Sequence, residues 1–308
     1  MLITREIGRK TVLLLLTFIS LQTFAQDFFT HSDSLHTQRK NAVYLTYGSG
    51  VVLTYTGLYS LWYRQQGLSG FRFHDDSRDW KQMDKIGHTA TAYQLGELGM
   101  KSLMWAGVER RKAMWQGSLS GLIFLTGVEI FDGFSPSYGF STTDMLANVA
   151  GSMLLIGQEL AWEEQRIRLK FSFFPSGYAQ YRPELLGHNL SEQWLKDYNG
   201  QTYWLSMNIA SMTQWENMPK WLNLALGYSA GGMTGSLTNP THNAAGEAIP
   251  EFTRYRQFFL SLDVDLARLN PRSKLLKTLC STFGFIKVPL PTIEYNQQGM
   301  TTFHAIYF

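Results

Sequence analysis

The stretch MDKIGHTATAYQLGE, residues 83–97, places an Asp, a Lys, a His and a Glu among small and apolar residues. Its pattern extends in both directions and predicts a helix over about 81–106. Asp84 and His88 lie four positions apart, so they share one face of that helix. The stretch therefore predicts a helix with a polar inner face, serving either as a polar contact between packed helices or as a catalytic or metal site.

Other apolar segments surround this helix. Residues 41–63 contain no charge and, at about 23 residues, are long enough to span a bilayer. Helices are also expected over about 113–132 and 142–165, where the apolar cores of about 15 residues are short for a span. These segments predict a membrane-associated helical bundle.

Small residues recur at helical spacing within the bundle. Gly117 and Gly121 are four positions apart, and so are Ala147 and Gly151. Such spacing lets neighbouring helices approach closely, in a membrane or in a buried soluble bundle.

After residue 166, apolar and polar residues alternate with a period close to two, which is typical of β-strands. In RQFFLSLDVDLA (256–267), Leu260 and Leu262 point to one side, whereas Ser261 and Asp263 point to the other. An ordinary half-buried strand and a strand between lipid and a lumen share this pattern. Strands are expected at 168–174, 201–212, 221–232, 256–267 and 299–308.

These patterns together predict an α+β protein. An N-terminal membrane-associated helical bundle, residues 26–165, precedes a C-terminal antiparallel, strand-rich and partly barrel-like region, residues 166–308. The final strand ends on Phe308, which resembles the closing strand of bacterial outer-membrane barrels but also suits an ordinary last strand.

The N-terminus indicates export. Residues 1–25 read as a signal peptide, because basic residues precede an apolar run at 11–24 and Ala25 offers a small-residue cleavage site. The only cysteine is Cys280, so neither an intramolecular disulfide nor a lipidated cysteine at that cleavage site is available. We expect the mature chain in the cell envelope, at the outer membrane or on the periplasmic face of a membrane.

The composition of the chain indicates which classes of binding partner to expect. The net charge is +3, too small to indicate nucleic-acid binding, and no basic stripe with interleaved aromatics is present. Charged residues make up only 17% and aromatic residues 14%, a balance that suits contact with lipid as well as a large soluble core. We therefore expect a lipid membrane as a partner and no nucleic acid, while the sequence specifies no protein partner.

The three central helices each carry a polar pair on one face. Glu129 and Asp132 are three positions apart, and Asp144 and Asn148 are four apart, as Asp84 and His88 are. If the helices pack together, these pairs converge on one polar pocket. The candidate site residues are Asp84, Lys85, His88, Glu129, Asp132, Asp144 and Asn148.

Two chemistries fit these residues. Carboxylates with one histidine bind hard or borderline cations, so a divalent cation is a candidate cofactor. Its candidate ligands are Asp84, His88, Glu129 and Asp144. Alternatively, two close acids with separated pKa values form a general acid/base pair, with Lys85 as their electrostatic partner.

Structural roles explain several of these residues equally well. The sequence STTD (141–144) forms a capping box at a helix start, and Asp132 lies beside glycine and proline at a helix end. Glu129 is harder to explain, because it interrupts the apolar run FLTGVEIF and a buried carboxylate without a partner is costly. The sequence contains no phosphate-binding loop, paired-cysteine zinc pattern, HExxH or GxSxG motif.

The segments DKIGH (84–88), GVEIFDGF (127–134) and GFSTTDMLANVAG (139–151) occur in an order that resembles a known family. This is the YfiM-like family of uncharacterised bacterial envelope proteins, described as predicted periplasmic lipoproteins with a domain of unknown function. A looser similarity links the same order to VanZ-like membrane proteins. The resemblance covers a core at about 80–160 and implies a location rather than a chemistry. The chain departs from the family in lacking a lipidation cysteine, so its helices or strands must provide any membrane attachment.

Three hypotheses of function follow, and the sequence leaves open whether the protein is an enzyme. The first is a non-enzymatic structural or assembly role in or at the outer membrane. The second is a membrane-associated hydrolase or transferase that acts on a lipid or cell-wall intermediate through the Asp/His/Glu site. It lacks a nucleophile motif, but metal-activated water needs none. The third is a small transport or channel role, in which intramembrane acids line a polar path.

Overall fold

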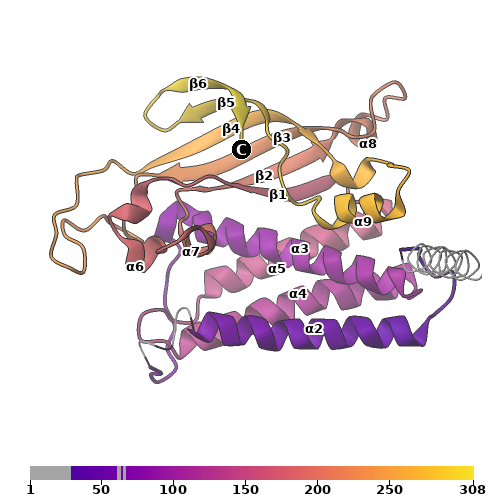
Figure 1. The fold of residues 1–308 in the computed structure, drawn as a ribbon, viewed down its shortest axis with the longest axis horizontal. Helices are drawn as coiled ribbons and strands as arrows, with labels where there is room; N and C mark the ends of the chain where they lie inside the picture. Colours follow the sequence, from indigo (N-terminus) through magenta and orange to yellow (C-terminus); the bar gives the residue numbers. More distant parts are fainter. Residues whose placement is uncertain (1–28, 61–63, 65–66) are drawn as a thin grey trace, which may run out of the picture.

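The computed structural model describes residues 29–60, 64 and 67–308, so the expected signal peptide at 1–25 lies outside the described residues. Figure 1 shows a layer of long helices beneath a curved sheet. The described α-helices are α2 (Thr37–Leu58), α3 (Met83–Trp105), α4 (Arg110–Gly133), α5 (Thr142–Trp162), α6 (Pro183–Leu186), α7 (Leu190–Lys196), α8 (Ile209–Thr213) and α9 (Lys274–Thr282). The strands are β1 (Ile167–Phe173), β2 (Gln201–Asn208), β3 (Leu222–Gly231), β4 (Tyr255–Val264), β5 (Leu290–Asn296) and β6 (Thr301–Tyr307).

The helices of the bundle occur in the order that the sequence predicts. The predicted helices over 81–106, 113–132 and 142–165 correspond to α3, α4 and α5. The first helix, α2, begins at Thr37, ahead of the uncharged segment at 41–63. Among the residues described, none of the helices combines the length and the hydropathy needed to cross a membrane. The expected spanning segment is therefore not supported where the structure describes it, because polar residues and glycines dilute the apolar character of α2.

Helix α3 is the central helix and packs closely on both α4 and α5. A Cβ added at Gly117 of α4 would lie 2.3 Å from the backbone nitrogen of Met100, and one at Gly151 of α5 would lie 2.1 Å from the carbonyl oxygen of Thr89. These glycines lie in the predicted four-residue repeats, so the small residues do allow close helix approach.

We predict that Gly117→Ala lowers the free energy of unfolding by about 1–3 kcal/mol, because the new methyl group must displace the backbone of α3. Gly157→Ala on α5 is the matched control, since a Cβ there has nothing within 4 Å. Alanine at this exposed helical position should stabilise the protein by about 0.5–1 kcal/mol. Urea denaturation of both variants tests the pair, and equal shifts would contradict close packing at Gly117.

The strands form one open antiparallel sheet in the order β1-β2-β3-β4-β5-β6. The predicted strand at 201–212 is too long, because the Asn208 side chain accepts a hydrogen bond from the Ser211 backbone and starts α8. Strand β5 was not predicted, since Pro291 within it argues against a strand. The proline is accommodated at an irregularity in the pairing between Leu290 and Thr292.

The two faces of the sheet have an unusual polarity. On β4, Ser261 and Asp263 are 4% and 0% exposed, whereas Leu260 and Leu262 are 43% and 48% exposed. The predicted alternation is confirmed, but the polar side chains form the buried face. The Asp263 carboxylate is paired there with the Lys170 ammonium group, whose Nζ atom lies 2.7 Å from Asp263 Oδ2. An ordinary half-exposed sheet shows the reverse arrangement.

Helix α3 joins the helical layer to the first two strands. The Tyr93 hydroxyl donates to the carbonyl oxygen of Ile167 at 3.2 Å. Nearer the start of the helix, Gly87 packs against β2. A Cβ added at Gly87 would lie 2.8 Å from the Tyr203 hydroxyl oxygen. Glu97, further along α3, forms a separate buried ion pair with Arg168 of β1. These contacts hold the first four turns of α3 against the sheet.

Candidate functional site

A strained segment of backbone positions the start of α3. Trp80, Lys81 and Gln82 adopt left-handed conformations, with φ values of 48°, 51° and 66°. Each such residue costs of order 1–3 kcal/mol, so the surroundings must hold the segment. The Tyr228 hydroxyl donates to the Lys81 carbonyl oxygen, and Arg256 donates to the Gln82 side chain at 2.6 Å. Strands β3 and β4 therefore fix the point at which the helix begins.

The ammonium group of Lys85 lies at the centre of three carboxylates. Its Nζ atom is 2.6 Å from Asp76 Oδ2, 3.0 Å from Asp84 Oδ2 and 2.8 Å from Asp144 Oδ1. Asp76 also accepts hydrogen bonds from Ser141 Oγ and from the hydroxyl of Thr143. Lys85 thus joins α3 to α5 and to the loop that precedes the strained segment.

His88, one turn further along α3, faces a second group of acids. Its Nδ1 atom lies 3.0 Å from Asn148 Oδ1. On the other side of the ring, Nε2 lies 3.8 Å from Asp84 Oδ1 and 3.6 Å from Glu129 Oε1. Asp84 therefore contacts Lys85 through one oxygen and faces His88 with the other, and this second oxygen also accepts a hydrogen bond from the Tyr198 hydroxyl.

Glu129 is the most deeply buried acid of the group. It is 1% exposed, and its Oε2 atom accepts a hydrogen bond from the Ser141 backbone at 3.1 Å. Within the described residues, Oε1 has no hydrogen-bond partner, and neither does Nδ2 of Asn148. Two unsatisfied buried polar atoms beside one histidine are a departure from normal burial.

The carboxyl groups differ in acidity. Burial raises the pKa of Glu129 to about 7, although the charge of His88 opposes the shift. Burial, together with the charge of Asp84, raises the pKa of Asp144 to about 8. For Asp84, burial is outweighed by the charges of His88 and Lys85, which lower its pKa below the usual value. The acids Asp84, Asp144 and Asp76 in turn raise the pKa of Lys85, despite its burial.

The structure brings together most of the predicted site residues. We call the resulting group the polar cluster. It consists of Asp76, Asp84, Lys85, His88, Glu129, Asp144 and Asn148. Asp132 lies one turn beyond Glu129, and its charge contributes to the raised pKa of that residue. The predicted capping role is also real, because Ser141 Oγ accepts a hydrogen bond from the Asp144 backbone at 3.0 Å.

Sequence reasoning missed Asp76 and Tyr198. Asp76 lies in a polar loop beside Asp75, and nothing in the sequence distinguishes the two acids. The neighbouring Asp75 side chain instead caps its own loop by accepting from the Ser77 backbone. Tyr198 follows α7, more than a hundred residues after its partner Asp84, so no local pattern could indicate the contact.

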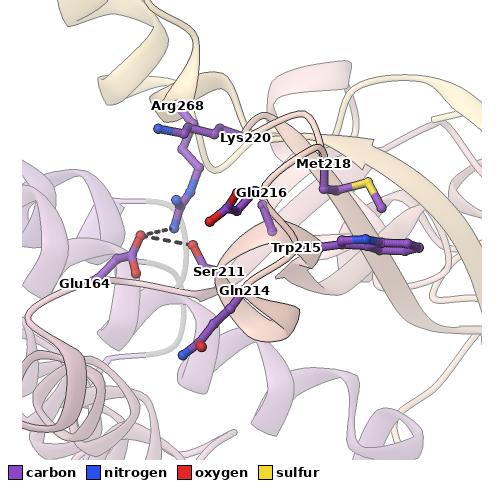
Figure 2. Close-up of a pocket in the computed structure, with 9 residues that line it drawn as sticks. Glu164, Ser211, Gln214, Trp215, Glu216, Met218, Lys220 and Arg268 are labelled. Carbon is purple, nitrogen blue, oxygen red and sulfur yellow. Dashed lines mark hydrogen bonds and ion pairs between the residues drawn. The ribbon is translucent and has the colours of Figure 1, made fainter.

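A pocket of about 310 Å³ lies elsewhere in the molecule. Figure 2 shows Arg268 and Ser211 directed at Glu164, to which they lie 2.8 and 3.0 Å away. Glu164 follows the end of α5, whereas Asp144 lies at its start, and a 21-residue helix is about 30 Å long. The pocket is therefore remote from the polar cluster, and these charged groups are paired with each other.

Comparison with known proteins finds a match to a family model over part of the chain. Residues 70–156 match a family model described as "Predicted periplasmic lipoprotein (DUF2279)". The matched segment contains every residue of the polar cluster and runs from the loop before α3 into α5. No curated protein and no solved structure matches the chain.

The match supports an uncharacterised family of envelope proteins, and the protein is exported to the periplasmic side of the cell envelope. The finer resemblance to YfiM-like and VanZ-like proteins stays a prediction.

Proposed function

We propose that the protein is a non-enzymatic structural or assembly component of the cell envelope that binds a lipid membrane, in or at the outer membrane. The observation that carries this proposal is the apolar face of the sheet, which is exposed over β3 to β6. We define this apolar face by Leu226, Phe258, Leu260, Leu262, Ile293, Tyr295 and Phe303.

The residues of the apolar face are neighbours across the sheet. Leu226 pairs with Leu260, Leu260 with Ile293, and Ile293 with Phe303. All of them are exposed, whereas Phe171 and Tyr203 on the same face of β1 and β2 are partly covered beside α3. Contiguous apolar surface of this kind marks a site that binds a protein or a membrane.

Exposed apolar side chains on the helical layer favour a membrane over a single protein partner. Leu53 on α2, Ile123 on α4 and Leu146 on α5 are also exposed. These side chains belong to the layer that lies beneath the sheet in Figure 1, so one protein interface would have to cover parts of both layers. A lipid phase contacts such surfaces without needing shape complementarity. Two tryptophans are exposed as well, Trp194 in α7 and Trp221 just before β3. Tryptophan is enriched at the boundary between lipid and water, so these residues suit a membrane-binding protein.

The polar cluster has a structural role in this proposal. Its ion pairs join α3 to α5 and to the loop before α3, and Tyr198 links it to the segment that precedes β2. An internal charged centre of this kind orients the helices relative to the sheet. The helical layer and the apolar face are thereby held in one arrangement.

Vesicle flotation tests the membrane proposal. We expect the full chain to float with vesicles of phosphatidylethanolamine and phosphatidylglycerol. The double variant Leu226→Asp/Leu260→Asp should bind at least tenfold more weakly, because charged side chains on a lipid-facing strand cost a few kcal/mol at depth. The control Asn217→Asp/Gln298→Asp adds the same charge at exposed polar positions and should float like the parent.

Two results would contradict the proposal. One is a parent protein that does not float although it is folded. The other is equal flotation of the leucine variant and its control. A folded parent that fails to float but forms a specific complex through the same leucines would indicate a protein partner instead.

A second candidate function is a membrane-associated hydrolase or transferase. The observation that favours it is the separation of pKa values between Asp84, which is lowered, and Glu129, which is raised to about 7. Such separation is a feature of acid/base pairs in active sites. Glu129→Gln tests this second function. If the protein is an enzyme, the variant should lose turnover while keeping its fold. If the protein has only the membrane-binding role, the variant should float with vesicles like the parent.

A further inference from the structure

We propose that the polar cluster binds one divalent transition cation, Zn²⁺ or Mn²⁺. The ligands are one oxygen each from Asp84, Asp144 and Glu129, and Nε2 of His88. This proposal concerns the interior of the helical layer and is independent of the membrane contact proposed above.

The spacing of atoms from three of the four proposed ligand residues permits such a site. One atom each from Asp84, His88 and Asp144 lie within 4.8 Å of one another. A point between three atoms so arranged lies at most about 2.8 Å from each, so side-chain movements of less than about 1 Å reach bond lengths of about 2.0–2.2 Å. Asp84 and His88 lie on α3 and Asp144 lies on α5, so regular helices position all three.

The histidine is oriented as a metal ligand. Nδ1 lies 3.0 Å from the Asn148 side-chain oxygen, so metal binding at Nε2 uses the tautomer that keeps its proton on Nδ1 and donates it to Asn148. In that tautomer the unprotonated Nε2 lies 3.8 Å from Asp84 Oδ1 and 3.6 Å from Glu129 Oε1, which places it beside two of the proposed oxygen ligands. Protein metal sites commonly use a carbonyl group in this way to fix a ligating imidazole.

An unsatisfied buried oxygen provides independent support. Glu129 is almost wholly buried, and its Oε1 atom has no hydrogen-bond partner within the described residues while it faces His88 Nε2 at 3.6 Å. Leaving a buried carboxylate oxygen without a donor is costly. A cation between these two atoms satisfies both of them at once.

Lys85 contacts two of the proposed ligands without occupying the side of Asp84 that faces His88. Its ammonium group contacts Oδ2 of Asp84 and Oδ1 of Asp144, whereas Oδ1 of Asp84 is the oxygen that faces His88. The ammonium ion and the proposed cation would thus share Asp84 from opposite oxygens. Metal binding requires ionised carboxyl groups and a neutral imidazole, and in that form the four acids and one ammonium group of the cluster have a formal charge of −3 before the ion is counted. One divalent cation reduces this to −1, which makes the burial of so many acids less costly.

The ligand set indicates the class of cation. Mg²⁺ and Ca²⁺ prefer oxygen ligands alone, whereas imidazole with carboxylates suits Zn²⁺ and Mn²⁺. Titration with each of the two ions distinguishes between them, and Mg²⁺ serves as the control ion.

The test uses the full chain, stripped with a chelator and then titrated separately with ZnCl₂, MnCl₂ and MgCl₂. We expect one Zn²⁺ or Mn²⁺ per chain by equilibrium dialysis and elemental analysis, and an increase in Tm on binding. Asn148→Ala should weaken binding 10- to 100-fold, because this residue positions the imidazole without touching the ion. Glu129→Gln, which keeps the volume of the side chain, should weaken it at least as much.

Glu97→Gln is the matched control. Glu97 is a buried glutamate on α3 that pairs with Arg168 and Lys101 outside the polar cluster. This variant loses a buried carboxylate but should bind the ion like the parent. Failure of the folded parent to bind either ion stoichiometrically would overturn the proposal, and so would equal weakening in Glu97→Gln and Glu129→Gln. Neither outcome affects the flotation result, so the two proposals fail separately.

Discussion

Lys85→Met is expected to lower the free energy of unfolding by about 3–5 kcal/mol, the usual cost of removing one partner from a buried ion pair. The ammonium group contacts three carboxylates at 2.6–3.0 Å, so its loss leaves Asp76, Asp84 and Asp144 without their shared cation. Methionine retains the apolar part of the side chain, which limits the change to the charge. Chemical denaturation at pH 7 in the presence of a chelator measures the effect.

Lys101→Met provides the comparison for this prediction. Lys101 lies on the same helix and pairs with Glu97 at 3.0 Å, but its side chain is 31% exposed, and Arg168 still pairs with Glu97 in its absence. A partly exposed ion pair contributes little, so we expect a loss of about 1 kcal/mol or less. Equal destabilisation of both variants would contradict the role of Lys85 as the shared partner of three buried carboxylates.

The stability of the metal-free protein is expected to fall as the pH rises from about 4.5 to about 7. Glu129 has a pKa raised to about 7 in the folded state, so between these values the unfolded carboxyl is ionised while the folded one keeps its proton. Its stabilising contribution is therefore complete below about 4.5 and is lost as the pH rises. A difference of about 2.5 pKa units corresponds to about 3 kcal/mol.

Glu129→Gln isolates this contribution. The amide stays neutral, so the variant should become more stable relative to the parent as the pH rises, by about 2.5 kcal/mol between pH 5 and pH 8. Urea denaturation across this range in the presence of a chelator checks the difference. Parallel pH profiles for the two proteins would contradict a raised pKa at Glu129.

Other groups act on the same profile. Asp144 has a pKa raised to about 8 and adds to the loss between about pH 4 and 8. His88 also has a raised pKa, because nearby acids outweigh its burial, and its contribution is likewise lost with increasing pH. Asp84 and Asp76 have lowered pKa values, so their contributions are lost on acidification below about pH 4. The contributions of Asp144, Asp84 and Asp76 are common to the parent and Glu129→Gln, so the comparison removes most of their effect, whereas Glu129 supplies part of the His88 shift and that part is lost in the variant.

Much of the helical layer could be predicted from the sequence, because its signals are local. Helical periodicity located α3, α4 and α5, and four-residue spacing of small residues marked the contact at Gly117. The same spacing placed Asp84 and His88 on one face, and they do face the same cluster. The strand β5 was missed because Pro291 argues against a strand unless the pairing around it is irregular.

The sequence by itself determined the elements, the alternation along the strands and the polar face of each central helix. Only the tertiary structure decided that Asp76 and Tyr198 complete the polar cluster, because contacts between distant loops leave no periodic signal. It also decided which face of the sheet is buried. An alternation of period two assigns Leu260 and Asp263 to opposite faces, but only the packing around them places the aspartate inside and the leucine outside.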